Sequence, residues 1–174
     1  MTALGRACWV VLVIAASFAP EGKAHAQTRR FAVDARVLTG LSVGGGDGQA
    51  RLRRTPLFVE AGMHTWLEEE EQVVIGAAVR VEVEDRASIG AVVRAGFRAM
   101  LAPIELRPSI GLVAILAPFT LFGVDAGMVL AMQFTDRIAV LAHLVIDAYL
   151  YGSDLPTGTV VTSFNGGLGF EVGL

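Results

Sequence analysis

Apolar and polar residues alternate along most of this chain with a period of two. From Ile89 to Leu101, every odd-numbered position is apolar, while the even-numbered positions hold glycine and arginine together with one valine and one methionine. The last ten residues, 165–174, alternate in the same way, with leucine, phenylalanine and valine opposite glycine and glutamate. A strand whose two faces meet different environments has this period, whereas a helix repeats every 3.6 residues. The pattern therefore predicts β-strands.

Eight segments of this kind follow one another, and most are ten to fifteen residues long. This length is near or above the roughly nine to eleven residues that a tilted strand needs to cross a bilayer. The links between them fall on two sides of the barrel in turn. On one side two links are long, at 44–55 and 152–163, and two are short, at 84–87 and 117–119. On the other side all three links are tight, at 68–72, 102–103 and 135–137. Long loops on one side and short turns on the other are typical of outer-membrane barrels. The segments are 33–42, 57–64, 73–83, 89–101, 105–114, 122–133, 140–149 and 165–174.

The chemistry of the two faces indicates which one points outward. One face of each segment is almost purely aliphatic, and the other carries Gly, Ser, Arg, Asp, Glu and His. A soluble barrel would turn the charged face to water, but a continuous aliphatic exterior would aggregate there. In lipid that exterior is stable, and a closed barrel pairs every backbone group. We therefore expect an all-β, membrane-spanning, antiparallel up-and-down β-barrel of about eight strands, with a polar lumen and an apolar exterior.

A helical inner-membrane protein is the main structural alternative. Its best candidate segment is 110–132, which is interrupted by Pro118, Asp125 and three glycines. A membrane helix tolerates one such interruption more readily than several together. The period of two in the same segment favours strands.

The first 26 residues match a secretory signal peptide. Arg6 precedes an apolar stretch at 7–18, and residues 24–26 read Ala-His-Ala, a small-x-small cleavage site. This apolar stretch is too short to cross a hydrocarbon core of ~30 Å as a helix. We therefore expect a cleaved signal peptide at 1–26, a barrel domain at 27–174, and a location in the outer membrane of a Gram-negative-type bacterium.

Residues 27–174 contain no cysteine and no lysine, and they carry 12 arginines against 16 acidic residues. The missing cysteines exclude disulfides and thiolate metal sites from this part of the chain. The acidic balance argues against a nucleic-acid partner. Nothing in the sequence indicates a cofactor or a metal.

The charged residues on the inward faces are the main candidate site. Buried charges need partners, and arginine suits paired contacts with carboxylates. We expect an ion-pair network that closes the lumen, and the alternative is a narrow ion-conducting path. His64 and His143 lie on the same faces. The network residues are Asp34, Arg36, Glu60, Arg80, Glu82, Arg94, Arg98, Glu105, Arg107, Asp125, Asp147 and Glu171.

In architecture, residues 31–174 resemble the small eight-stranded outer-membrane proteins, whose familiar members are the OmpA transmembrane domain and the OmpX-like proteins. The family's assembly signal has a glycine six residues from the end and apolar residues third from last and last, and Gly169, Val172 and Leu174 fill these places. Leu174 stands where the family usually has phenylalanine. The resemblance implies recognition by the barrel-assembly machinery and a monomer. Pro108 departs from a regular strand, and we expect a bulge or kink there.

Two further groups of residues bear on function. Arg51, Arg53 and Arg54 fall in the first long link, where they are suited to the phosphates of lipopolysaccharide, and a solvated loop is the simpler interpretation. Some eight-stranded outer-membrane proteins are enzymes, notably the lipid A deacylases, but neither His64 nor His143 is followed two residues later by the serine of those enzymes. We expect no catalytic residues. The expected role is structural or surface interaction in the cell envelope, with outer-membrane lipids as partners.

Aromatic residues gather near the expected strand ends. Three of them lie at the inner side of the membrane in this arrangement and six at the outer. The inner residues are Phe31, Trp66 and Phe134, and the outer ones are Phe58, Phe119, Phe122, Tyr149, Tyr151 and Phe164. Aromatic girdles at the two interfaces are typical of membrane barrels. The sequence therefore predicts that these rings face the lipid headgroups.

Overall fold

The computed structural model describes residues 31–46, 49–67, 72–84, 87–101, 104–135, 137–155 and 158–174. The predicted signal peptide at 1–26 and the acidic link at 68–71 lie outside these ranges. The strand segments are β1 (Phe31–Gly46), β2 (Gln49–Trp66), β3 (Val73–Glu82), β4 (Ile89–Phe97), β5 (Ala99–Leu101), β6 (Ile104–Ala117), β7 (Leu121–Gln133), β8 (Ile138–Gly152) and β9 (Val160–Gly173).

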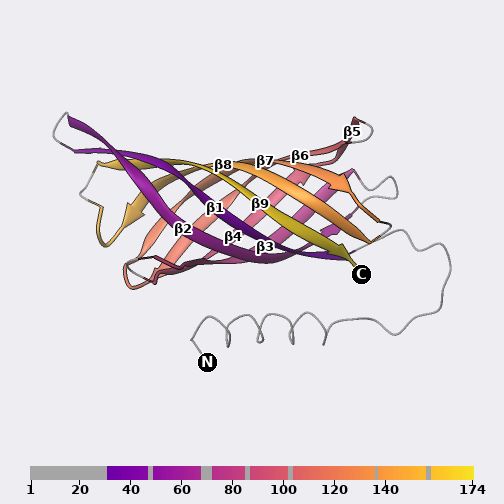
Figure 1. The fold of residues 1–174 in the computed structure, drawn as a ribbon. Helices are drawn as coiled ribbons and strands as arrows, with labels where there is room; N and C mark the ends of the chain where they lie inside the picture. Colours follow the sequence, from indigo (N-terminus) through magenta and orange to yellow (C-terminus); the bar gives the residue numbers. More distant parts are fainter. Residues whose placement is uncertain are drawn as a thin grey trace, which may run out of the picture.

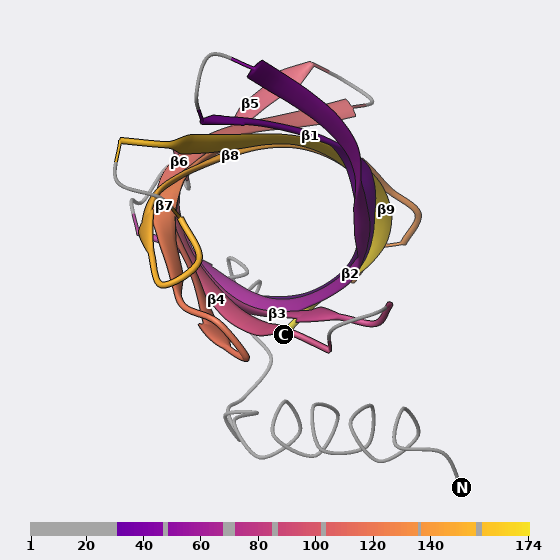
Figure 2. The ribbon, with the colours of Figure 1, turned by 90° about the vertical axis from the view of Figure 1, so that its left-hand side faces the viewer.

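These segments form one closed antiparallel barrel (Figures 1 and 2). Each strand pairs with its neighbour in sequence, β9 returns to pair with β1, and β4 pairs with β6. The short β5 continues β4 after a break at Arg98, so the wall has eight strands. The predicted fold class is therefore confirmed. The start of β1 and the end of β9 lie at one end of the barrel, called here the terminal end, and the tip of the β1/β2 hairpin lies at the other, the hairpin end (Figure 1).

The period of two in the sequence becomes two physically different surfaces. On β6, Leu112 is 68% exposed on the outside, while the adjacent Val113 is buried on the inside. On β8, Leu144 is exposed and His143 is buried. Successive side chains of a strand point to opposite faces, so alternation in the sequence separates an aliphatic exterior from the interior throughout the wall.

Glycines on the inner face let neighbouring strands approach closely. A Cβ atom added to Gly167 would lie 2.0 Å from the carbonyl oxygen of Val37, and one added to Gly111 would lie 2.1 Å from that of Val93. No side chain fits at such distances, so these positions require glycine. Inward-facing glycines of this kind allow the sheet to curve into a barrel.

The two long links expected from the sequence are shorter than predicted. In the expected link at 44–55, the chain stays paired from Gly40 opposite Thr55 to Gly46 opposite Gln49, so β1 and β2 extend into one long hairpin. A register shift between Leu38 and Gly40 gives β2 one extra residue near Pro56. The second link, predicted at 152–163, is shorter in the structure and comprises residues 153–159 between β8 and β9. In the first segment residues 51–54 are exposed at every position, so the alternation that marks a strand is absent. At the start of β9 the inward positions are Val161 and Ser163 and the outward ones Val160 and Thr162, so each face mixes apolar and polar residues.

Of the bulge or kink predicted at Pro108, the wall shows no bulge. Gly96 pairs with Ser109 and Ala99 pairs with Leu106, so the register is the same on both sides of Pro108. The expected bulge is therefore absent. Instead the pairing is interrupted, because proline has no N–H to donate, and the neighbouring strand breaks at Arg98.

Candidate functional site

The structure places all twelve of the predicted network residues on the inner face of the wall, from every wall strand. Ten of them are buried, and the side chains of Arg94 and Arg98 are only 11% and 18% exposed. Eleven of the twelve make ion pairs with one another. The remaining one, Glu82, accepts a hydrogen bond from the Ser88 hydroxyl at 2.7 Å.

Glu60 lies at the centre of one group of these charges and is 0% exposed. The guanidinium of Arg80 donates to its Oε2 at 3.0 and 3.1 Å. Arg94 donates to both Glu60 oxygens at 2.5 and 3.2 Å, and Arg36 lies 3.5 Å away. One carboxylate therefore holds three guanidinium groups from three different strands.

The same arginines also reach two aspartates across the lumen. Arg94 on β4 binds both oxygens of Asp125 on β7 at 2.7 and 2.9 Å, and its side chain passes over Gly111 on the intervening β6. Arg80 donates to Asp147 at 2.8 Å. Asp147 also accepts hydrogen bonds from Ser163 and Asn165, both at 3.2 Å. The bonds of Arg94 and Arg80 to the two aspartates connect strands that are not adjacent in the wall.

A second group lies nearer the terminal end. Arg107 donates to Glu105 at 2.6 Å and to Glu171. The Nδ1 atom of His64 lies 3.2 Å from Asp34, and its Nε2 atom lies 3.2 Å from Arg107. The Nε2 atom also lies 3.3 Å from Glu171, so the imidazole lies between two carboxylates, one at each ring nitrogen.

Arg36 connects the two groups. Its guanidinium donates to Asp34 at 3.0 Å in the second group, and it lies within ion-pair distance of Glu60 in the first. It also contacts Nδ1 of His143 at 3.1 Å. Since that nitrogen must accept, His143 carries its proton on Nε2. The charged lumen is therefore one connected network.

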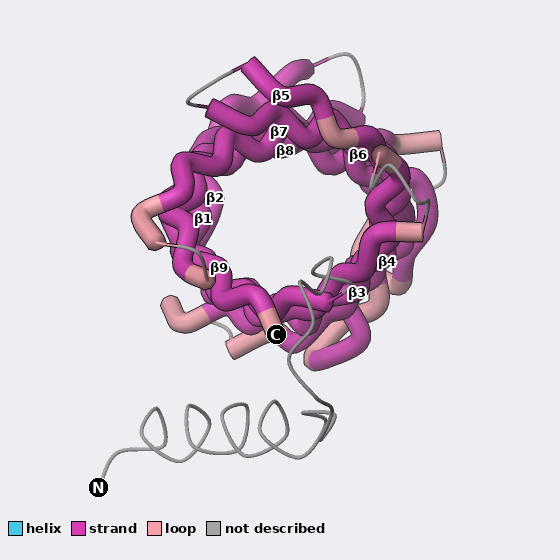
Figure 3. Tube along the Cα trace, turned by 90° about the vertical axis from the view of Figure 1, so that its right-hand side faces the viewer, coloured by secondary structure: helices cyan, strands magenta, loops and turns pink. Residues whose placement is uncertain are grey.

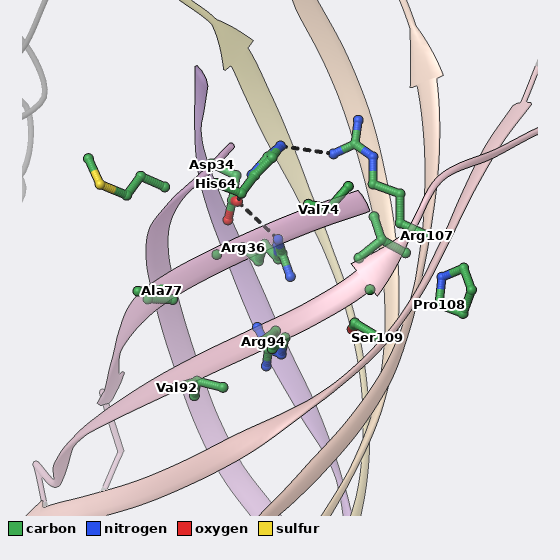
Figure 4. Close-up of a pocket in the computed structure, with 15 residues that line it drawn as sticks. Asp34, Arg36, His64, Val74, Ala77, Val92, Arg94, Arg107, Pro108 and Ser109 are labelled. Atoms are coloured by element: carbon green, nitrogen blue, oxygen red, sulfur yellow. Dashed lines mark hydrogen bonds and ion pairs between the residues drawn. The ribbon is translucent and has the colours of Figure 1, made fainter. Parts of the chain in front are cut away.

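A small cavity lies between the two groups (Figure 4). Its volume is about 60 Å³, which is enough for a few water molecules. Figure 4 shows the bonds of Arg36 with Asp34 and of Arg107 with His64 beside it. Two polar atoms of its lining, Asp34 Oδ1 and Arg36 Nε, have no hydrogen-bond partner in the described part of the chain. The cavity is therefore suited to water that bridges these groups.

Two apolar clusters share the lumen with the network, one at the hairpin end and one beside the second group of charges, where Arg107 pairs with Val129 and Glu105 with Ala131. At the hairpin end, Val92, Val113, Ile115 and Tyr149 form a buried cluster, with Phe119 and three other side chains packed against it. Toward the terminal end, a second buried cluster lies on β7 and β8. Its members are Val129, Ala131, Ala139 and Leu141.

The aromatic prediction is wrong for three rings. Phe58, Trp66 and Tyr149 are buried in the lumen instead of facing the lipid. The guanidinium groups of Arg98 and Arg107 lie over the Trp66 ring, 5.8 and 5.6 Å from its centroid, which is within the range of cation–π attraction. All three rings occupy inward positions in the alternation of their strands, and this signal was present in the sequence.

The three arginines of the predicted first loop lie on a strand. Arg51, Arg53 and Arg54 are exposed on the part of β2 that extends toward the hairpin end. Arg54 pairs with Glu84 at 2.9 Å. Arg51 and Arg53 make no ion pair with any residue that the structure describes. The hairpin therefore presents positive charge beyond the barrel wall.

The three residues of the predicted assembly signal lie on β9 or directly after it. Gly169 pairs with Arg36 of β1, Val172 pairs with Val33, and Leu174 is half exposed at the end of the chain. These residues belong to the strand that closes the ring between β1 and β8.

His64 and His143, which lie on the inward faces of the sequence pattern, are buried in the lumen. Neither lies at a lipid-facing rim. Among the described residues, no group of three or more histidine, cysteine, aspartate or glutamate side chains is arranged to hold a metal ion. No helix in the described ranges has the length and apolar character to cross a membrane.

Comparison with known proteins gives structural likenesses only. No protein-family model matches the chain, and no curated protein matches it. A de novo designed transmembrane β-barrel superposes with a TM-score of 0.50 at 9% identity, over 80% of this chain and 95% of the other. Neisserial surface protein A gives 0.49 at 10% identity, over 83% and 97%. Ail, the attachment invasion locus protein of Yersinia pestis, gives 0.49 at 13%, over 83% and 99%. The fold is therefore that of a small transmembrane β-barrel.

Proposed function

We propose that this chain is a closed, structural barrel of the bacterial outer membrane that contacts the surrounding lipid through its surface. The observation that carries the proposal is the filled lumen. Ion pairs cross it between strands that are not adjacent, one apolar cluster fills it at the hairpin end, and a second lies beside the charges toward the terminal end. Eight strands leave an interior that side chains can fill. In this proposal the protein is exported through its cleaved signal peptide, is recognised at Gly169, Val172 and Leu174 by the assembly machinery, and acts as a monomer.

The filled lumen leads to an electrical prediction. An ion would have to displace the buried Val113, Ile115 and Tyr149 at the hairpin end and then enter a network whose charges are already paired. We therefore expect no stepwise conductance when the refolded residues 27–174 are inserted into planar bilayers. Regular current steps of one defined size would contradict the closed barrel and favour the narrow channel.

A second part of the proposal concerns the hairpin. Arg51, Arg53 and Arg54 extend beyond the wall at the end opposite the termini, which in an outer-membrane barrel is the outer surface. Guanidinium groups make strong, paired hydrogen bonds with phosphate. We propose that they bind the phosphates of lipopolysaccharide.

Replacing Arg51, Arg53 and Arg54 together with glutamine should weaken binding of purified lipopolysaccharide at least ~10-fold, because the loss of one charge-assisted bond of about 1.5–3 kcal/mol suffices for that change. Binding is measured by titration of the folded barrel in detergent at two salt concentrations. Arg137→Gln is the matched control, since Arg137 is an exposed arginine at the terminal end. Equal affinity of the triple variant and the control would contradict the proposed contact.

We propose no catalytic role. A lipid A-modifying enzyme needs its reactive groups at the lipid-facing rim, and His64 and His143 face the lumen.

A further inference from the structure

The tip of the β5/β6 hairpin lies outside the ring formed by the other strands. Both end-on views show β5 and the adjoining start of β6 turned away from the barrel axis (Figures 2 and 3). The departure begins where the wall pairing is interrupted, at Arg98 opposite Pro108. Beyond this point β5 pairs with β6 alone among the described strands. The tip therefore projects toward the membrane side of the wall.

This tip exposes apolar side chains on both of its faces. Met100 and Leu101 are adjacent in β5, so they point to opposite sides, and they are 59% and 61% exposed. Ile104 and Phe97 add exposed apolar surface at its two sides. No charged residue occurs between Ala99 and Ile104.

The other links at the terminal end have the opposite character. The link after β2 contains Glu68 to Glu71 in sequence, and the link after β7 contains Asp136 and Arg137. Charged turns suit an aqueous surface. An uncharged apolar hairpin with a free strand edge would aggregate in water, so this tip needs a different environment.

We propose that the β5/β6 tip is an interfacial lipid anchor that lies at the boundary between headgroups and acyl chains of the inner leaflet. The inference rests on the proposed membrane placement of the barrel. Continuity with the lipid-facing wall supports it, since Leu101, Ile104 and Leu106 continue the outward row that includes Ile110 and Leu112. Among the described residues β5 has a strand partner on one edge only, and an open edge is costly in the hydrocarbon centre, where N–H and C=O groups find no partner. At the boundary, headgroups and water can satisfy that edge.

Site-directed spin labelling tests this anchor. Residues 27–174 lack cysteine, so Leu101→Cys and Met100→Cys each give a single labelling site, one on each face. Leu112→Cys, in the middle of β6, is the control for the hydrocarbon core, and Leu52→Cys, on the hairpin beside the arginines, is the control for water. These two leucines are 68% and 66% exposed, close to Leu101. The labelled barrels are refolded into phosphatidylcholine vesicles, and relaxation by oxygen is compared with relaxation by a soluble nickel chelate.

We expect oxygen to relax both tip labels more than the chelate does, with a depth shallower than that of position 112. Chelate access at positions 100 and 101 equal to that at position 52 would overturn the anchor while leaving the barrel in place. Labels at 100 and 101 that neither agent reaches would overturn it in favour of a protein partner or a second copy of the chain. Chelate access at position 112 would overturn the membrane barrel and the anchor together.

Discussion

Glu60→Gln should lower the free energy of unfolding by about 3–5 kcal/mol, the usual cost of removing one partner from a buried ion pair. The variant keeps the size of the side chain but removes the charge that Arg36, Arg80 and Arg94 share. Trp66 is the only tryptophan after residue 26, and its ring lies in the lumen beside two guanidinium groups. Its fluorescence therefore reports on the loss of lumen structure during urea titration in detergent.

Glu84→Gln is the matched control for this experiment. Glu84 also pairs with an arginine, Arg54, but at the exposed hairpin end. Exposed ion pairs contribute about 0–1 kcal/mol, so this variant should unfold close to the unsubstituted protein. A loss of stability at Glu84 as large as that at Glu60 would show that the burial of the network contributes nothing.

The second large effect is expected at Gly167. A methyl group there would meet the carbonyl oxygen of Val37 at 2.0 Å and the side chain of Leu38 at 2.7 Å. A backbone carbonyl in a paired strand has little room to move, and overpacking costs roughly 1–3 kcal/mol or more. We expect Gly167→Ala to lose at least ~2 kcal/mol and to fold in lower yield. Both are measured by urea titration and by the heat-dependent mobility of the folded band on an SDS gel.

The adjacent glycine supplies the control. A Cβ atom on Gly166 would make only an ordinary contact, 3.6 Å from a methyl group of Leu144 on the outer face. Gly166→Ala should therefore leave the folded fraction and the unfolding midpoint nearly unchanged. If the two variants behaved alike, the close approach of β9 to β1 would not be the reason for glycine at position 167.

The fold could be predicted from the sequence because one physical contrast, lipid outside and charge inside, acts on every strand. Where that contrast is absent, the sequence does not predict the strands. In the hairpin beyond Gly40 and Thr55, residues 51–54 are exposed on both faces of β2, so the sequence carries no alternation there and predicts a loop. The rings of Trp66 and Tyr149 were assigned by their distance along the strand, although the alternation placed them inside.

The site was predictable as a set of residues but not as a set of bonds. Inward positions follow from the period of each strand, so Asp34, Glu60 and the arginines could be selected from the sequence. Their partners depend on how far each strand is staggered when the ring closes. Arg80 binds Asp147, which lies 67 residues away in the chain. Register shifts between Leu38 and Gly40, between Ile89 and Gly90 and between Phe122 and Gly123 further change which side chains meet, and no local pattern encodes that result.

The bonds across the lumen also depend on the closure of the ring. Arg80 on β3 reaches Asp147 on β8, Arg94 on β4 reaches Asp125 on β7, and Arg107 on β6 reaches Glu171 on β9. In a sheet that lacks the last three strands, Arg80 and Arg94 would share the single carboxylate of Glu60, and Arg107 would keep only Glu105. Buried charges with incomplete partners are costly, so closure of the ring between β1 and β9 completes the pairing of the arginines as well as the backbone hydrogen bonds.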